Sequence, residues 1–204
     1  MKPSLKSVSL SITTVVLLLV VYLPSLGTNE LGEVKALTLE IKELSALMAM
    51  LIFTVLLSSM ISENIRDSLI FTRCKHVLPS SRIKQLLSKD HRFGISFIAK
   101  NLSEIDQAET PEEEHDAWWG MYKSQKDATE VKNRHLWYLS LRDAFSASLI
   151  LTIYSILVLF LPLPGILLGG WKYHLAATLV IMISARQNGN RMATNVVSAH
   201  FSGN

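Results

Sequence analysis

The sequence predicts an all-α polytopic membrane protein with four transmembrane helices and a helical domain inserted between the second and third. Charge is unevenly spread, because the segment from Glu63 to Asp143 holds 13 of the 20 Lys and Arg residues and 13 of the 17 Asp and Glu residues. Only 18% of all residues are charged, against about 25% in an average soluble domain. Long uncharged stretches flank the charged middle, so we expect one part of the chain to lie in lipid and another in water.

Four windows without a charged residue are the candidate spans: Ser7 to Asn29, Leu44 to Ser62, Ala144 to Trp171 and Tyr173 to Ala185. About 20 apolar residues of helix cross the hydrocarbon core, so the first three windows are long enough. The fourth is short. It crosses either as a short helix whose flanking Lys172 and Arg186 reach opposite interfaces, which we favour, or as a longer helix that begins near Ile166.

The first window has a second interpretation. Two lysines, Lys2 and Lys6, precede its apolar run, which is a pattern typical of a secretory signal peptide. The apolar run is long for a signal peptide, however, and the residues after it form a poor cleavage site. We therefore expect an uncleaved first span.

The distribution of Lys and Arg predicts the orientation. Positive charge concentrates on the cytoplasmic side of membrane proteins, and four spans with the charged middle inside satisfy this rule at every loop. We expect spans one and two within residues 1–62, a cytoplasmic helical domain at 63–143, spans three and four within 144–185, and a cytoplasmic amphipathic tail at 186–204. The protein would then lie in the inner (plasma) membrane with both termini in the cytoplasm.

The inserted domain contains a clear helix start. Thr110 is a good N-cap residue, Pro111 suits the first helical position and Glu113 completes a capping box. A later helix is expected to begin near Asp127 and to continue without a break into the third span. The second span is likewise expected to continue past Glu63, so that both connections are continuous helices. Four charged residues are expected at the membrane boundary: Arg142, Asp143, Lys172 and Arg186.

Two groups of residues are candidate functional sites. Ser148, Thr152 and Ser155 lie on one stripe of the third span, where small hydroxyl residues either pack helices together or line a pore. Trp118, Trp119 and Tyr122 concentrate aromatic surface on one helix. Because adjacent tryptophans cannot both face one core, these three residues are candidates for contact with a partner protein or a neighbouring subunit.

No motif indicates catalysis. The chain has no glycine-rich phosphate loop, no G-x-S-x-G, no H-E-x-x-H and no C-x-x-C, and we expect no catalytic residue, no metal and no cofactor. The net charge of +3 does not favour direct nucleic-acid binding. We therefore expect a non-enzymatic homo-oligomer that senses the membrane or anchors a cytosolic protein partner there. An oligomeric pore is the alternative, and an enzyme at the membrane surface is the third.

The predicted layout has four spans, a helical insert and a polar tail. The insert contains "AWWGMYKSQKDATEVKNRHLWYLSLRDAF", and the tail contains "ARQNGNR". That layout resembles the small four-span membrane subunits of prokaryotic antiphage defence systems, of the Kiwa membrane subunit type. The resemblance implies a homo-oligomer that senses membrane disturbance and recruits a cytosolic DNA-binding effector.

Overall fold

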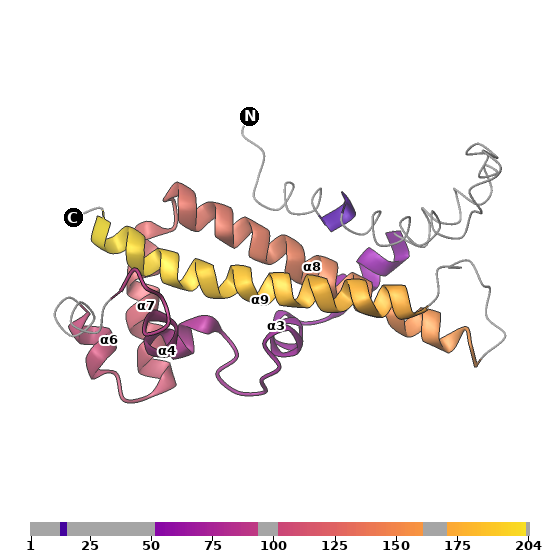
Figure 1. The fold of residues 1–204 in the computed structure, drawn as a ribbon, viewed down its shortest axis with the longest axis horizontal. Coiled ribbons are helices and arrows are strands. Elements are labelled where there is room, and N and C mark those ends of the chain that lie inside the picture. The colour runs from indigo at the N-terminus through magenta and orange to yellow at the C-terminus, as the bar shows by residue number, and fades with distance from the viewer. Residues whose placement is uncertain (1–12, 16–51, 94–101, 161–170, 203–204) are drawn as a thin grey trace. The chain divides into compact units, whose positions relative to one another are not determined.

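The computed structural model describes residues 13–15, 52–93, 102–160 and 171–202 (Figure 1). These residues form helices, turns and irregular segments, and no strand occurs among them, so the all-α class is confirmed. The first candidate span, Ser7 to Asn29, lies outside the described residues except for a helical turn at 13–15. The second candidate span is described only from residue 52 onward.

Seven helical elements have bounds within the described part of the chain. They are α3 (Glu63–Phe71), the 3-10 helix η1 (Pro79–Arg82), α4 (Ile83–Leu87), α6 (Ser103–Gln107), α7 (Pro111–Gln125), α8 (Thr129–Leu157) and α9 (Trp171–Ser202). Residues 52–60 are also helical. The chain divides into two compact units. Unit 1 comprises Met1–Arg66 and Ser140–Ile183, and unit 2 comprises Asp67–Leu139 and Ser184–Asn204.

The prediction of four membrane-spanning helices is wrong. By length and composition, the described residues contain one helix that could cross a membrane, Thr129–Leu157. The fourth predicted span does not form a separate apolar helix, because Tyr173 to Ala185 is only the first part of α9, which continues through Arg186 and Arg191. The described residues therefore do not support a multi-pass protein with both termini on one side.

One of the two expected helix continuities is interrupted. Asp143 lies inside α8, so the helix passes without a break through the predicted membrane boundary. On the other side the helix at 52–60 ends, residues 61 and 62 form a bend, and α3 begins at Glu63. Ser58 supplies the reason in part, because its carbonyl accepts from the Ile61 N–H at 3.2 Å in a tight turn.

Helix α7 begins as its capping residues predict. The Thr110 hydroxyl accepts a hydrogen bond from the Glu113 N–H at 3.3 Å, and Pro111 occupies the first turn. The Glu113 carboxylate in turn accepts from the Glu109 N–H at 2.7 Å. This contact, followed by weaker ones to Thr110, lowers the pKa of Glu113. The capping box therefore fixes where the helix starts.

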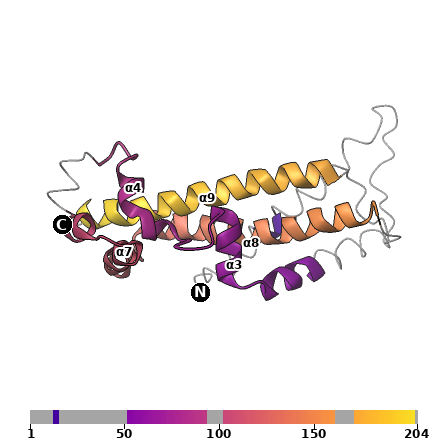
Figure 2. The same cartoon turned by 90° about the horizontal axis from the view of Figure 1, so that it is seen from below.

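Unit 2 has an apolar core. Figures 1 and 2 show α4, α6 and α7 beside the C-terminal part of α9. Buried side chains of these helices form one cluster with Phe93, with Leu102 and with Val131 of α8: Ile83, Leu87, Phe93, Leu102, Ile105, Trp118, Met121, Val131, Ala193, Val196 and Val197. The tail of the chain thus contributes a full helix face to this core, with Met192 and Phe201 packed at its edge.

Unit 1 is held together differently, because polar side chains fill much of its interior. The Ser148 hydroxyl lies 2.6 Å from that of Thr178, and the Thr152 hydroxyl lies 2.9 Å from the same Thr178 oxygen. All three are buried. These hydrogen bonds join α8 to α9, and the Thr13 hydroxyl donates to the Ser140 carbonyl at 3.0 Å.

Two glycines test the packing of unit 2. A Cβ at Gly189 on α9 would lie 2.9 Å from Phe71 Cζ and 3.1 Å from the Tyr138 ring, whereas a Cβ at Gly120 on α7 would meet nothing within 4 Å. We expect Gly189→Ala to lower the free energy of unfolding by about 1–3 kcal/mol through overpacking. Gly120→Ala should raise it by about 0.4–1 kcal/mol, since alanine restricts the unfolded chain. Thermal unfolding followed by circular dichroism measures both, and equal stabilisation by the two variants would contradict the packing.

Candidate functional site

The two tryptophans predicted to contact a partner occupy different environments on α7. Trp118 is buried in the core of unit 2, and its indole N–H donates to the Ala193 carbonyl of α9 at 3.0 Å. Trp119 has 41% of its surface exposed. The prediction of a partner contact therefore needs correction for Trp118. Its ring has almost no exposed surface, and its N–H is already hydrogen-bonded within unit 2.

The aromatic side chains of α7 stack on one another, from the buried Trp118 to the exposed Trp119. The Trp119 and Tyr122 ring centroids lie 5.1 Å apart, and the Trp118 and Tyr122 centroids lie 5.2 Å apart. Lys123 Nζ lies 5.7 Å from the Trp119 ring centroid, within range of a cation–π interaction. His115 also stacks on Trp119, at 6.2 Å. We call His115, Trp119, Tyr122 and Lys123 the aromatic surface.

Hydrogen bonds to α8 and η1 orient two side chains of the aromatic surface. The Tyr122 hydroxyl lies 3.1 Å from His135 Nδ1 on α8, and His115 Nδ1 lies 2.7 Å from the Ser80 hydroxyl of η1. Burial, and then the charge of Asp127, raise the pKa of the Tyr122 hydroxyl. Tyr122 therefore stays a neutral, oriented side chain. The aromatic surface is rigid enough to act as a docking face, because its rings lose little further freedom on contact.

The predicted hydroxyl stripe lies inside unit 1. Ser148, Thr152 and Ser155 are all buried. Ser148 and Thr152 contact Thr178, and the Ser155 hydroxyl donates to the Leu151 carbonyl at 2.8 Å. The Ser148 and Thr152 contacts join α8 to α9, whereas the Ser155 contact lies within α8. Of the two interpretations left open by the sequence, packing is the one that the positions of these hydroxyls favour.

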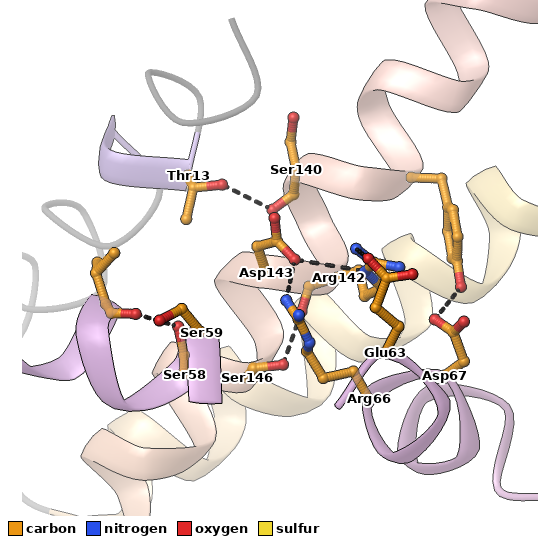
Figure 3. A network of polar contacts seen from close by, with 12 residues as sticks. Thr13, Ser58, Ser59, Glu63, Arg66, Asp67, Ser140, Arg142, Asp143 and Ser146 are labelled. Atoms are coloured by element: carbon orange, nitrogen blue, oxygen red, sulfur yellow. Dashed lines mark hydrogen bonds and ion pairs between the residues drawn. The ribbon is translucent and has the colours of Figure 1, made fainter. Parts of the chain in front are cut away.

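Two of the predicted boundary charges, Arg142 and Asp143, form ion pairs. Arg66 Nη1 donates to the Asp143 carboxylate at 2.6 Å, Arg142 Nε lies 3.4 Å from the same oxygen, and Arg142 Nη2 lies 3.6 Å from the Glu63 carboxylate (Figure 3). Arg142 is buried. The Asp143 carboxylate thus lies beside two guanidinium groups.

The other two boundary charges differ from each other. Lys172 is exposed, and its Nζ lies 5.9 Å from the ring of the adjacent Trp171. Arg186 lies in unit 2 rather than at an exposed edge of unit 1. Its Nε and Nη2 donate to the Ile70 carbonyl at 2.9 and 2.6 Å.

Sequence reasoning missed two residues that matter to unit 1. Arg66 pairs with Asp143, and Thr178 contacts two of the three stripe hydroxyls. His174 is fully buried one turn before Thr178. The spacing of His174 and Thr178, one helical turn apart, is the signal that could have indicated a polar face on α9. No spacing rule could have indicated Arg66, because it meets Asp143 from a distant segment.

No catalytic arrangement emerges from the described residues. A cavity of about 290 Å³ on unit 2 is lined by Leu102, Ser103, Ala117, Gly120, Met121, His200 and Phe201. Its lining contains no carboxylate to activate either His200 or Ser103. Within the described part of the chain, no three His, Cys, Asp or Glu side chains gather closely enough to hold a metal ion.

No protein-family model, no curated protein and no solved structure matches this chain.

The different environments of the two tryptophans predict different losses of stability. Trp118→Ala should lower the free energy of unfolding by about 3–5 kcal/mol, because it empties a core position and removes the hydrogen bond from the indole to the Ala193 carbonyl. Trp119→Ala should change it by less than about 1 kcal/mol. Chemical denaturation followed by tryptophan fluorescence and circular dichroism compares them, and similar losses in the two variants would contradict the assignment of Trp118 to the core.

Proposed function

We propose that the protein is a membrane-associated, non-enzymatic helical protein that anchors a cytosolic partner protein. Unit 1 contacts the lipid, and the aromatic surface of unit 2 contacts the partner. The observation that carries this proposal is the reversed polarity of unit 1 relative to unit 2.

The two units distribute polar and apolar side chains in opposite ways. Among the described residues, unit 1 has fifteen of the nineteen exposed large apolar side chains. It also has eleven of the fourteen buried polar or charged residues. Unit 2 has sixteen of the twenty-two buried apolar residues. Unit 2 is therefore arranged as a water-soluble domain is, and unit 1 is not.

Lipid accounts for the arrangement of unit 1. In water, exposed apolar patches of this extent are unfavourable and mark an interaction surface. In hydrocarbon, apolar side chains on the outside cost nothing, and helices associate through small residues and hydroxyl hydrogen bonds. The bonds from Ser148 and Thr152 to Thr178 are of this kind. Helix α8 is also long and apolar enough to cross a membrane.

The cytoplasmic placement of unit 2 is supported by charge. Residues 63–143 hold 13 of the 20 Lys and Arg residues, and Lys and Arg near apolar segments favour the cytoplasmic side. The partner contact is supported by Trp119, because exposed, rigid tryptophans are enriched where proteins bind one another. A homo-oligomer and a role in antiphage defence stay predictions from the sequence.

Lysine substitutions on the exterior of unit 1 test the lipid contact. Val180 is 63% exposed on α9. If Val180 faces lipid, Val180→Lys should reduce the fraction of protein in alkali-washed membranes, because lysine costs about 2.5–3.5 kcal/mol at the centre of a spanning helix. Leu69→Lys is the matched control, since Leu69 is an exposed apolar residue of unit 2. A Val180→Lys chain that stays in the membrane fraction and gains solubility would contradict the proposal.

Tryptophan substitutions on unit 2 test the partner contact. Trp119→Ala should abolish co-purification of a cytosolic protein with the detergent-extracted chain, because a central tryptophan carries about 2 kcal/mol or more of a typical interface. Trp137→Ala is the matched control, since Trp137 is 45% exposed in the same unit. Mass spectrometry of the captured proteins gives the readout. Equal capture by the two variants would exclude the aromatic surface as the docking face.

A further inference from the structure

We propose that Arg73, Arg82 and Arg186 form a binding site for a phosphate group, and that the headgroup of an anionic phospholipid supplies it. The three residues come from the turn after α3, from η1 and from α9, and all belong to unit 2. The choice of a lipid as the source rests on the membrane association proposed above, whereas the phosphate site itself does not.

Arg186 is held at the end of α3. Its Nε and Nη2 donate to the Ile70 carbonyl, and Nη2 also donates to the Thr72 hydroxyl at 3.1 Å. Ile70 is in the last turn of α3, where carbonyls lack helical donors and attract cations. The guanidinium of Arg186 is thereby fixed beside the turn that carries Arg73.

Arg82 contacts Phe71, the last residue of α3. Its Cζ lies 5.5 Å from the centre of the Phe71 ring, and its Nη2 donates to the Asn190 side-chain oxygen at 3.3 Å. Its Nε is buried and has no hydrogen-bond partner among the described residues. A buried donor without an acceptor is costly, so Arg82 gains from any rearrangement that gives this Nε an acceptor, and an oxyanion at the guanidinium provides one.

Arg82 and Arg186 contact neighbouring residues at the end of α3, because Arg82 stacks on Phe71 and Arg186 donates to Ile70 and Thr72. Burial first, and then the positive charges of Arg73 and Arg186, lower the pKa of Arg82. Within the described segments, none of the three forms an ion pair with a carboxylate, whereas Arg66, Arg92 and Arg142 each do. Three positive charges without a countercharge are unfavourable, and a bound anion would remove that cost.

The backbone of the turn that follows α3 is conformationally constrained. Thr72 has φ 53° and His76 has φ 47°, the left-handed region that a β-branched residue such as threonine rarely adopts. The Arg73 N–H donates to the Ser68 carbonyl at 3.1 Å. The turn thus presents the exposed Arg73 in a fixed conformation, although the local backbone alone would not favour it.

Phosphate is the anion that fits this chemistry. The guanidinium fork donates two parallel hydrogen bonds to phosphate oxygens, and it is weakly hydrated, so less water must be removed on binding. A lipid headgroup is the source because Arg186 follows Ile183 by three residues on α9, and Ile183 is one of the exposed apolar side chains of unit 1.

Two measurements on the full-length chain in an uncharged detergent test the site. The first measures thermal unfolding with inorganic phosphate against chloride at equal ionic strength. The second counts, by native mass spectrometry, the phosphatidylglycerol and phosphatidylcholine molecules retained by the protein. The variants are Arg73→Gln, Arg82→Gln and Arg82→Lys. Arg191→Gln is the matched control, since Arg191 is exposed and no side-chain contact holds it among the described residues. Arg186 is left unchanged because it caps α3.

We expect phosphate to raise the unfolding temperature of the wild type and of Arg191→Gln, and phosphatidylglycerol to be retained over phosphatidylcholine. Arg73→Gln and Arg82→Gln should each weaken phosphatidylglycerol binding about fivefold. Arg82→Lys should restore only part of it, because lysine keeps the charge and lacks the fork.

Other outcomes separate the parts of the proposal. If phosphate stabilises the protein but phosphatidylglycerol is not preferred, a soluble phosphate compound is the ligand and the lipid assignment is overturned. If neither ligand distinguishes the wild type from Arg73→Gln and Arg82→Gln, the site is overturned. A chain that proves water-soluble without detergent overturns the proposed membrane association, and the phosphate measurement still decides the site.

Discussion

The hydrogen bonds that join Ser148 and Thr152 to Thr178 are the interaction on which unit 1 depends. They connect α8 to α9 through buried hydroxyls, and the described interior around them contains few large apolar side chains. In water such a pairing would be weak, because each hydroxyl exchanges a water contact for a protein contact of similar strength. Outside water, no solvent molecule competes for these hydroxyl hydrogen bonds. Small hydroxyl residues also let helix backbones approach closely. The pairing therefore makes physical sense in a medium that offers no hydrogen bonds.

Unit 2 depends on the opposite effect. Trp118 and the buried aliphatic side chains around it remove apolar surface from water, which is the main favourable term in the folding of soluble domains. The indole N–H of Trp118 is satisfied by the Ala193 carbonyl, so a large side chain is buried without an orphaned donor. Because α9 supplies Thr178 to unit 1 and Val196 and Val197 to unit 2, one continuous helix carries both kinds of packing face.

Local signals were predictable from the sequence, and distant contacts were not. The start of α7 at Pro111 followed from Thr110 and Glu113, since a capping box involves only neighbouring residues. The pattern could not decide which of Trp118 and Trp119 faces inward, because that depends on Ala193 in a distant helix. The four-span prediction was wrong in part because an uncharged window does not show where a helix begins and ends. The window at Tyr173 to Ala185 is only part of a longer helix.

The arginines of the chain show how a guanidinium can be accommodated away from bulk water. Arg142 is buried beside the carboxylates of Asp143 and Glu63, and Arg186 donates to a helix-terminal carbonyl. Arg82 has a ring face and one amide oxygen, and its Nε has no acceptor among the described residues. The first two arrangements are complete within the chain, since charge or donors are matched by acceptors. The third leaves one buried donor unmatched, and the phosphate group proposed above would supply an acceptor for it.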